Sequence, residues 1–382
     1  MKDQHVVVFG AGIAGLSSAL MLARCGMHVT VVESQNDWDI VGAGLTISGP
    51  SFRAIEALGI LSDVLEQGHA HPGIKVHDQH GQYLKTLTSP AIASQSGAAL
   101  PGAGGILRST LHRILLDHLK ACGVHVHMGV SCQSLQQLAT PESGTGCVAL
   151  VLSDGRELEC DAVVVAEGLF SASRRAIFPT SSAPSFTGQA CWRLVLDRPK
   201  HVDHRFFYLG GSVKVGLTPV SEQHMYLFLL EEVAQKPKRE ASELPVILRG
   251  LLAEFGGELR HIAESLHAHS DIVYRPLEAH LLKQPWHQGA VVLVGDAAHA
   301  TTPQLASGAG MAMEDGIVLA QEFAHASSVH EAFGRYFARR FERCKMVVEN
   351  SLQIGQLEVA RASAAQQAAV VESSLRQLAL PY

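Results

Sequence analysis

The first 33 residues combine an apolar run, a glycine-rich turn, an amphipathic stretch, a second apolar run and an acid. Residues 6–9 are typical of a buried parallel strand, and residues 28–32 predict a second one. Between them, residues 16–23 carry apolar side chains at helical spacing, and Gly26 is well placed to end that helix. This order constrains the chain to an α/β fold that begins with a strand–helix–strand unit.

The turn between the first strand and the helix matches the pattern G-x-G-x-x-G, and each glycine has a separate physical task. Gly10 makes the tight turn, Gly12 lets a pyrophosphate approach the backbone, and Gly15 allows the helix to pack closely on the strand. Ile13 and Ala14 complete the turn at the helix N-terminus, where unpaired N–H groups and the helix dipole attract phosphates. The turn therefore predicts a phosphate-binding site.

An acid closes the second strand at the position where such folds hold a ribose. Glu33 follows the glycine turn by about 20 residues and can accept both hydroxyl groups of an adenosine ribose. Strand, helix, second strand and acid have the order and spacing of a dinucleotide-binding unit. The pattern does not separate FAD from NAD, and a glycine turn without a ligand is the alternative interpretation.

Composition and charge exclude several other classes of protein. There are 30 Lys and Arg against 36 Asp and Glu, a net charge of -6, and no basic run, which argues against nucleic acid as a partner. We expect no transmembrane segment, since no apolar stretch reaches about 18 residues, and no signal peptide, since the chain runs directly into the first strand. Seven irregularly spaced cysteines favour reduced thiols and a cytoplasmic location.

Two pairs of histidines invite a metal interpretation. His69 and His71 are two residues apart, as are His267 and His269. Such pairs without a nearby cysteine or carboxylate set are more often surface residues than ligands. We therefore expect no metal site.

Further elements follow along the chain. Helices are expected at residues 51–68 and 109–122, and strands at 124–128, 147–153 and 157–165. The Gly/Ser-rich segment at 73–100 is expected to be irregular. Successive short strands between residues 184 and 280 are typical of an antiparallel meander, followed by a helix at 242–254. Residues 330–377 predict helix.

A second glycine-rich block follows the buried strand at residues 291–294. Gly295 and Asp296 place a carboxylate at the C-terminal edge of that strand, where open α/β sheets bind ligands. The small residues at 306–310 begin a helix, so the backbone near Gly308, Ala309 and Gly310 offers a second cluster of N–H donors. One helix end can serve a pyrophosphate and the other a flavin ring or ribityl chain, which favours a long cofactor such as FAD.

Because the parallel-strand pattern returns at residue 291, the antiparallel segment is interpreted as an insertion. We predict a Rossmann-like FAD-binding domain, an inserted, mostly antiparallel-sheet substrate domain, and C-terminal helices. The boundaries are 1–72, 98–180 and 283–345 for the first, 73–97 and 181–282 for the second, and 346–382 for the third.

Four motifs together resemble the single-component FAD-dependent aromatic hydroxylases, the family of para-hydroxybenzoate, salicylate, urate and alkylquinolone hydroxylases. They are the turn at 10–15 with Glu33, Arg108 ahead of a helix, Ala166-Glu167-Gly168, and the block from Gly295 through His299 and Pro303 to Glu314-Asp315. The resemblance covers roughly residues 1 to 345 and is loosely nearest the urate, alkylquinolone and salicylate branch. It implies that His299 is mostly structural.

The resemblance also implies roles for individual residues. Glu33 would hold the ribose, Arg108 the phosphates or ribityl chain, and Asp296 the ribityl or phosphate region. Pro303 would lie beside the flavin ring near the place where oxygen reacts, with the N–H groups near Gly308 and Ala309 at the pyrimidine side. Further residues expected at the cofactor are Ser34, Gly44, Glu167 and Gly310.

The chain departs from the family pattern at four places. Glu167-Gly168 replaces Asp-Gly, Ala306-Ser307-Gly308 replaces Gly-Gln-Gly, Pro50 replaces an asparagine, and Ser34 replaces a basic residue. We expect Ala306 to fit only if the backbone there avoids positive φ.

The implied activity is hydroxylation of an electron-rich aromatic or heteroaromatic small molecule. Only one G-x-G-x-x-G is present, so NADH or NADPH would dock transiently, and O2 would react with reduced flavin to a hydroperoxide that transfers oxygen to the ring. The inserted sheet would supply substrate contacts. Lys214, His224 and Tyr226 are the candidates, alongside Pro303 on the flavin side.

Each of these substrate contacts has a plainer interpretation. Lys214 would pair with a carboxylate or phenolate of the substrate, or be solvated, and Tyr226 would bind a ring oxygen, or be a core aromatic. Arg193, beside Trp192, is interpreted as part of a salt bridge between domains.

Two other functions stay open. One is a different FAD oxidoreductase, an oxidase or reductase, and the other is a non-catalytic flavin-binding partner protein. We expect a monomer or a homodimer.

Overall fold

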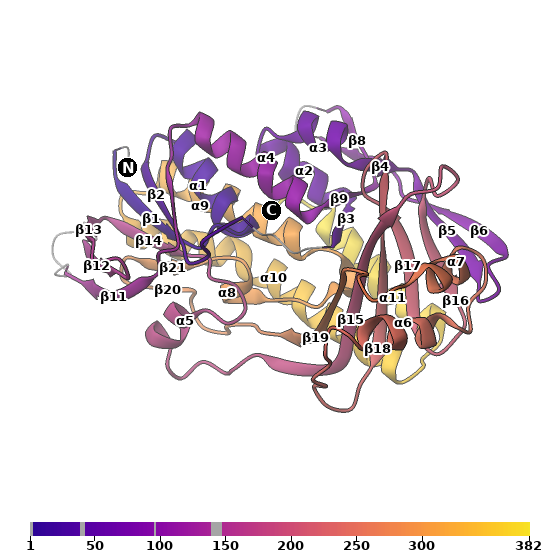
Figure 1. The fold of residues 1–382 in the computed structure, drawn as a ribbon. Helices are drawn as coiled ribbons and strands as arrows, with labels where there is room; N and C mark the ends of the chain where they lie inside the picture. Colours follow the sequence, from indigo (N-terminus) through magenta and orange to yellow (C-terminus); the bar gives the residue numbers. More distant parts are fainter. Residues whose placement is uncertain (1–2, 39–42, 95–96, 139–146) are drawn as a thin grey trace.

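The structure, a computed structural model, describes residues 3–38, 43–94, 97–138 and 147–382. It contains two large sheets that lie side by side, with the long helix α10 (Val329–Val359) running past both (Figure 1). The fold is mixed α/β, as the sequence predicted.

The first large sheet has six strands and carries the glycine-rich turn. Its order is β10 (Val126–Met128), β2 (His28–Glu33), β1 (His5–Phe9), β14 (Ala162–Val165), β21 (Val291–Leu293) and β20 (His287–Gln288). All neighbours are parallel except β20 and β21. β1, β14 and β21 are almost wholly buried and aliphatic, as expected of central parallel strands. Their carboxyl ends meet at one edge of the sheet.

Further helices and small sheets accompany the first sheet. The helices are α1 (Ile13–Arg24), α2 (Gly49–Ala57), α3 (Leu61–Gln67), α4 (Arg108–Ala121), α5 (Ala172–Ile177), α8 (Asp296–His299), the 3-10 helix η1 (Pro303–Leu305) and α9 (Gly308–His325). The small sheets are β3 (Gly44–Ser48), β9 (Ala103–Leu107) and β4 (His69–His71); β11 (Cys132–Gln137), β12 (Val148–Leu152) and β13 (Glu157–Cys160); and β7 (Ile92–Ala93) with β8 (Ala99–Leu100).

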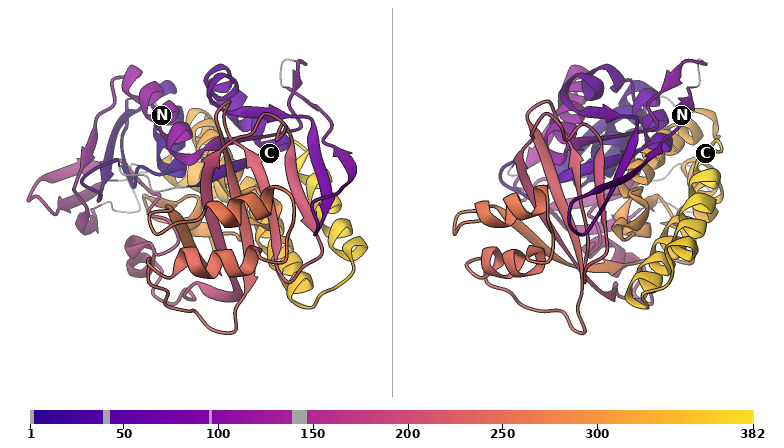
Figure 2. Two further views of the ribbon diagram at one scale, coloured as in Figure 1. Left: turned by 45° about the vertical axis from the view of Figure 1, so that its right-hand side comes forward. Right: turned by 90° about the vertical axis from the view of Figure 1, so that its right-hand side faces the viewer.

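The second large sheet has seven strands. Its order is β19 (Ile272–Ala279), β15 (Ser185–Asp197), β18 (His224–Glu232), β17 (Lys214–Pro219), β16 (Arg205–Leu209), β5 (Gly73–Asp78) and β6 (Tyr83–Thr88). Helices α6 (Leu244–Leu252) and α7 (Glu258–Ser265) cover one side, and α10 with α11 (Ala364–Leu378) lies on the other (Figure 2). The buried core against α6 and α7 includes Trp192.

Several expected elements differ from the observed ones. The stretch at 73–100 is not irregular, because β5 and β6 extend the second sheet. All six residues of β6 are exposed, so no alternation of apolar and polar residues reveals this strand. The single helix expected at 51–68 is two helices, separated where Gly59 takes a φ of +64°.

The order of the second sheet also differs from a simple meander. β15 pairs with β18 and β19, and the meander itself runs from β16 to β18. Helix α7 was not predicted, and the helical region from 330 breaks into α10 and α11.

The contact between α1 and the turn after β1 depends on Gly15. A Cβ atom at this position would lie 1.8 Å from the carbonyl oxygen of Gly10, which itself has a φ of +93°. The absence of a side chain therefore lets α1 start directly beneath the turn, as the fingerprint predicts.

Replacing Gly15 by alanine should destabilise the protein by about 2 kcal/mol or more, because the added methyl group overlaps backbone that cannot move aside. Urea denaturation of the variant measures this. Gly334→Ala in α10 is the matched control, since a Cβ there meets nothing within 4 Å. It should gain up to about 1 kcal/mol from helix propensity. Equal effects of the two substitutions would contradict the packing role of Gly15.

Candidate functional site

Two cavities meet at the carboxyl edge of the first sheet. The strand-end cavity, of about 450 Å³, lies beyond β1 and β2, and the inter-sheet cavity, of about 300 Å³, lies between the two large sheets. Gly12, Ala166 and Gly168 line both. The two cavities are therefore adjacent, with the glycine-rich turn between them.

Glu33 lines the strand-end cavity, where the sequence places the ribose-binding acid. Its Oε2 accepts a hydrogen bond from the backbone N–H of Ala11 at 2.7 Å, and its Oε1 accepts one from Gln35 N–H at 2.9 Å. Ser34 lines the same cavity and donates to Oε1 at 3.2 Å. The carboxylate is thus held against the glycine turn, with acceptor capacity left for a ligand.

Glu167 lines the strand-end cavity too, but its carboxylate is occupied by helix α5. It accepts hydrogen bonds from Ser171 Oγ at 2.7 Å, Ser173 N–H at 2.9 Å and Ser173 Oγ at 2.8 Å. The extra methylene, compared with aspartate, is used to reach the first turn of α5. This contact gives the departure at position 167 a structural role.

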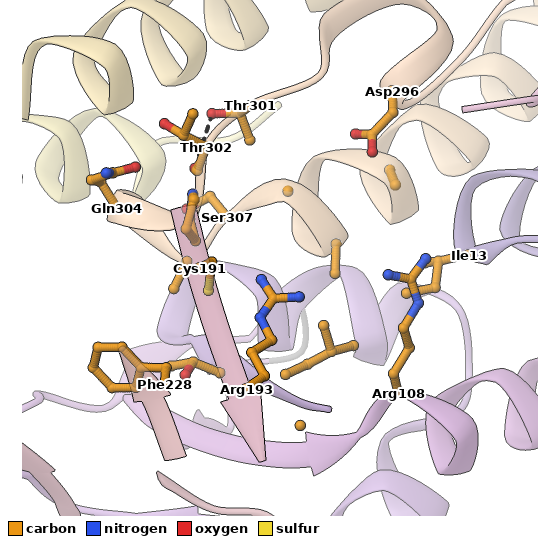
Figure 3. A pocket seen from close by; sticks show the side chains of 18 of the residues that line it. Ile13, Arg108, Cys191, Arg193, Phe228, Asp296, Thr301, Thr302, Gln304 and Ser307 are labelled. Carbon is orange, nitrogen blue, oxygen red and sulfur yellow. Dashed lines mark hydrogen bonds between the residues drawn. The ribbon is translucent and has the colours of Figure 1, made fainter. Parts of the chain in front are cut away.

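The inter-sheet cavity brings together residues from both halves of the sequence (Figure 3). From the first sheet and its helices come Gly12, Ile13, Ala14, Gly44, Arg108, Asp296, Pro303, Gly308 and Ala309. From the second sheet come Cys191, Arg193, Arg205, Lys214, Tyr226, Phe228 and Leu230. The first list consists of predicted cofactor residues, and the second contains the predicted substrate contacts Lys214 and Tyr226.

Two predicted cofactor glycines have packing roles instead of a place in the cavity lining. Within the described chain, Gly15 and Gly310 do not line either cavity. A Cβ at Gly310 would lie 2.3 Å from Ser51 Oγ, so this glycine lets α9 approach α2.

Arg108 and Asp296 stand at the end of the inter-sheet cavity nearest the glycine turn. Arg108 is the first residue of α4 and Asp296 the first of α8. Both side chains are directed into the cavity, near Ile13 (Figure 3). They supply one positive and one negative group where the resemblance expects phosphate and ribityl contacts.

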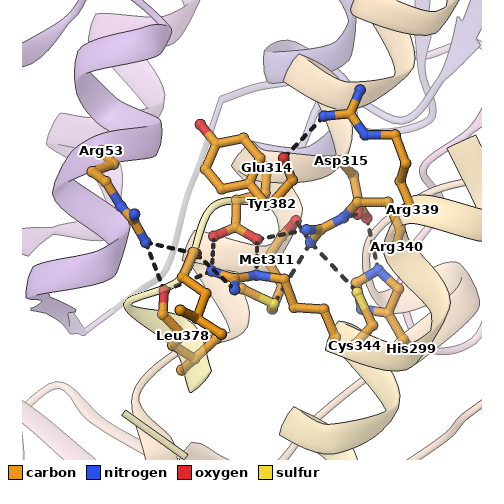
Figure 4. A network of polar contacts seen from close by, with 12 residues as sticks. Arg53, His299, Met311, Glu314, Asp315, Arg339, Arg340, Cys344, Leu378 and Tyr382 are labelled. Carbon is orange, nitrogen blue, oxygen red and sulfur yellow. Dashed lines mark hydrogen bonds and ion pairs between the residues drawn. The ribbon is translucent and has the colours of Figure 1, made fainter. Parts of the chain in front are cut away.

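A buried ion network holds the turn that carries Asp296 (Figure 4). Asp315 Oδ2 accepts from Gly295 N–H at 2.8 Å and lies 2.7 Å from His299 Nε2. Asp315 Oδ1 accepts from Arg340 Nε at 2.8 Å, and Arg340 also pairs with Glu314 at 2.6 Å. Asp315, Glu314 and Arg340 have no solvent exposure. The network therefore joins α8, α9 and α10 beneath the cavity.

The same network explains a cluster of metal-ligand types. The ligand atoms of His299, Asp315 and Cys344 lie within 4.8 Å of one another. However, both oxygens of Asp315 already accept hydrogen bonds, and the Arg340 guanidinium occupies the place beside them. The cluster is best described as an ion network.

The pKa values of His299 and Asp315 in this network shift in opposite directions. Burial opposes charge on the His299 ring, but Cys344 and Asp315 beside it outweigh burial and raise the pKa of His299 well above 6.5. Burial would raise the pKa of Asp315, yet His299 and Arg340 lower it to about 2. The imidazolium and the carboxylate are therefore both charged at neutral pH.

Lys214 is paired with a carboxylate of this chain, and 24% of its side-chain surface stays exposed. Its Nζ forms an ion pair with Glu358, near the end of α10. Glu358 also accepts from Gln189 at 3.1 Å and from Gln304 at 3.2 Å. These contacts tie β15, β17, η1 and α10 together at one wall of the cavity.

Tyr226 is buried, with its hydroxyl 2.7 Å from Thr46 Oγ1. Thr46 in turn lies 3.5 Å from Thr218 Oγ1. The tyrosine is therefore both a core aromatic, packed on Gly44, and a hydroxyl group held at the cavity wall.

Two expectations for the second sheet differ from the structure. Within the described chain, His224 lines neither cavity, and its Nδ1 lies 3.2 Å from Ser221 Oγ. Arg193 forms no salt bridge with any described carboxylate and lines the cavity instead. Its interpretation as a domain-interface salt bridge was wrong, because β15 turns every second side chain toward the cavity.

Sequence reasoning missed Arg205, Phe228 and Cys191 as cavity residues. Arg205 and Phe228 lie within strands that were recognised, so the sequence shows which side chains share a face of the sheet. It does not show which of the two faces borders the cavity. The pairing of strands decides the face.

The two histidine pairs differ in their exposure. His267 and His269 are exposed, as expected for surface residues. His71 is buried, with 4% of its surface exposed, so the surface interpretation was wrong for that residue.

The chain matches the family described as FAD binding domain over residues 3–351. The chain belongs to this family. It is 30% identical over 355 residues to 2-heptyl-3-hydroxy-4(1H)-quinolone synthase from Pseudomonas aeruginosa, covering 92% of this chain and 89% of that protein. It is 24% identical over 349 residues to FAD-dependent urate hydroxylase from Mycolicibacterium vanbaalenii, covering 90% and 86%. The present chain, as a member of this family, is an FAD-dependent monooxygenase.

Solved structures agree on the fold. The crystal structure of Klebsiella pneumoniae HpxO complexed with FAD and uric acid superimposes with a TM-score of 0.83 at 20% identity, covering 98% of this chain and 92% of that chain. Among the described residues, no helix is long and apolar enough to cross a membrane.

The shape of the site fits the family cofactor, FAD. An extended dinucleotide needs a ribose-binding acid, a glycine turn at the pyrophosphate and donors at the far end. Glu33, Gly12 and the start of α9 follow one another in that order along the two adjacent cavities, as such a cofactor would require.

Ala306 lies between η1 and α9 in the left-handed region, with a φ of 49° and a ψ of 34°. The condition set from the sequence, that Ala306 fits only where the backbone avoids positive φ, is therefore not met. Since alanine is strained in this conformation and glycine is not, the departure from Gly-Gln-Gly leaves strain beside the cavity.

Replacing Ala306 by glycine should raise the free energy of unfolding by up to about 1 kcal/mol, because the loss of strain exceeds the added entropy of the unfolded chain. Urea denaturation measures the change. Ala368→Gly, at an exposed helical position in α11, is the matched control and should lose about 1 kcal/mol. Losses in both variants would contradict strain at position 306.

The His299–Asp315 pair should make stability depend on pH in two windows. The pKa of His299 is raised, so its contribution is complete below pH 6.5 and is lost as pH rises toward the folded pKa. The pKa of Asp315 falls from 3.8 to about 2, so its contribution is lost as pH falls through that interval.

Melting temperatures of the wild type and of His299→Gln, compared from pH 6 to 9, test the alkaline window. The wild type should lose stability with rising pH more steeply than the variant. Parallel pH profiles would show that His299 is not charged in the folded protein.

Proposed function

We propose that this protein hydroxylates a small, electron-rich aromatic or heteroaromatic molecule with NADH or NADPH and O2. One observation carries the proposal: the inter-sheet cavity sets an aromatic and cationic sheet face opposite Pro303 and the N-terminus of α9. A planar molecule held on that sheet would face the flavin end of the site.

The residues of the first sheet are proposed to hold the cofactor. Glu33 would bind the ribose, Gly12 the pyrophosphate, and Arg108 and Asp296 the phosphate and ribityl groups. The 18-residue helix α9 directs its N-terminus into the cavity, so the N–H groups near Gly308 favour negative charge there. Bound FAD would supply the storage of electrons from NAD(P)H and the activation of O2.

The residues of the second sheet are proposed to hold the substrate and exclude water. Phe228, Leu230 and Leu277 give the cavity apolar walls that limit the entry of solvent. The Tyr226 hydroxyl is held by Thr46, so it can donate a hydrogen bond to a substrate oxygen or accept one from a substrate hydroxyl group. In the second case the substrate proton can move along that bond.

Several finer assignments belong to this proposal. We keep the division into FAD-binding, substrate and C-terminal segments, with β5 and β6 supporting the place of residues 73–97 beside the second sheet. Since one chain supplies the whole site, a monomer or a homodimer would suffice. All seven cysteines are free, which supports a reducing, cytoplasmic location.

Aromatic compounds should stimulate oxidation of NADH by the FAD-loaded protein, with matching O2 uptake. Phenols, quinolones and purines form the test panel, and product mass identifies hydroxylation. NADH oxidation that no compound stimulates would favour a reductase or oxidase, and a lack of turnover with bound FAD would favour a non-catalytic partner protein.

Glu33→Gln should weaken FAD binding by roughly 10- to 100-fold, because a neutral amide replaces a charge-assisted acceptor for the ribose hydroxyl groups. Quenching of FAD fluorescence measures the dissociation constant. The variant keeps an oxygen acceptor for Ala11 N–H, so the glycine turn should persist. Glu342→Gln, the same change at an exposed glutamate of α10 that lines neither cavity, is the control. Equal affinities in Glu33→Gln and wild type would remove Glu33 from the proposed site.

A further inference from the structure

The second sheet turns one ordered face toward the inter-sheet cavity. Across the strands, Arg193 pairs with Phe228, Phe228 with Gly216, and Gly216 with Phe207. Two residues away on the same two strands, Tyr226 pairs with Thr218, and both belong to the same face. Because side chains alternate along a strand, these rows and Arg205 belong to the side of the sheet that lines the cavity.

Gly216 makes room for a stacked pair on this face. A Cβ atom there would lie 2.6 Å from the ring of Phe228, so the ring occupies the space that a side chain on β17 would fill. The Arg205 guanidinium lies over the same ring, 4.7 Å from its centroid. The sheet thereby holds a flat guanidinium against a flat aromatic surface at the cavity wall.

The positive charge of Arg205 has no negative partner among the described residues of the cavity. Arg108 shares its end of the cavity with Asp296, and Lys214 is paired with Glu358. Among the described residues, Arg205 has no ion-pair or hydrogen-bond partner, and its Nε is buried without an acceptor. A buried donor without an acceptor is costly, so a ligand acceptor would be favoured strongly.

The neighbours of Arg205 offer no negative charge. Burial, followed by the positive charge of Arg205, lowers the pKa of His71 to about 4, which leaves that ring neutral at pH 7. The titratable group that acts on Arg205 itself is Tyr226, whose hydroxyl lies 2.7 Å from Thr46 Oγ1, and no described carboxylate pairs with Arg205. A bound anion would therefore supply the compensating charge.

We propose that the substrate is a planar aromatic carboxylic acid whose carboxylate binds the Arg205 guanidinium while its ring lies along Phe228. This inference rests on the proposed hydroxylase function. A guanidinium matches a carboxylate with two parallel hydrogen bonds, which gives both affinity and orientation. Arg205 thus takes the anion-binding role first expected of Lys214.

Arg193 provides the comparison on the same sheet face. It too has no carboxylate partner among the described side chains, but it is directed toward the loop that carries Ser307 (Figure 3). It therefore faces the flavin end of the cavity, and Arg193→Gln is the matched change of charge at the other end.

Paired probes test the proposal in the FAD-loaded protein. They are 3-hydroxybenzoate with 3-hydroxybenzamide, and 4-hydroxyquinoline-2-carboxylate with its carboxamide. Each amide keeps the shape of its acid but lacks the charge. Calorimetry and the change in flavin absorbance measure dissociation constants, and we expect at least one acid to bind roughly 10- to 100-fold more tightly than its amide.

Arg205→Gln should abolish this preference, weakening the acid roughly 10- to 100-fold and leaving the amide unchanged. Arg205→Lys should retain part of it, because the charge remains without the paired hydrogen bonds. Arg193→Gln should keep the preference. The inference is overturned if neither acid binds more tightly than its amide, or if Arg193→Gln removes the preference while Arg205→Gln does not.

Failure of this inference can be told apart from failure of the proposed function. Hydroxylation of neutral aromatics without any preference for acids would leave the function standing and remove the acid-binding role of Arg205. Preferential binding of acids without stimulated NADH oxidation and O2 uptake would support the anion site and count against the hydroxylase.

Discussion

The buried ion network around Asp315 is the interaction on which the site depends. Asp315 holds the backbone of Gly295 and, through Arg340, ties α9 to α10 with no exposure to solvent. Removing one partner of such a network leaves an unpaired buried charge, which costs about 3–5 kcal/mol. The turn that presents Asp296 and the helix that presents Gly308 are therefore fixed by the same carboxylate.

The two large sheets divide the chemistry between them. The first sheet supplies backbone N–H groups, the Glu33 carboxylate and small residues, which suit a long phosphate-containing cofactor. The second sheet supplies rings and guanidinium groups, which suit a planar ligand. Glu358, near the end of α10, links the elements between the two sheets. It contacts Lys214, Gln189 and Gln304.

The departures from the family pattern have different physical consequences. Glu167 is accommodated, because its longer side chain caps α5. Ala306 is tolerated under strain, since its φ of 49° is one that glycine adopts more readily. Both positions lie around the adjacent cavities, and neither alters the donors of Gly12 or the acceptor of Glu33.

The sequence by itself determined the strand–turn–helix unit with Glu33 and the block from Gly295, because these depend on spacing within short segments. The resemblance also predicted Arg108 and Asp296 as cofactor residues, and both line the inter-sheet cavity. Only the tertiary structure decided that β5 joins β16, that Lys214 meets Glu358 144 residues later, and that Arg205 covers Phe228. Such contacts depend on strand pairing and register, which local patterns of apolar and polar residues do not fix.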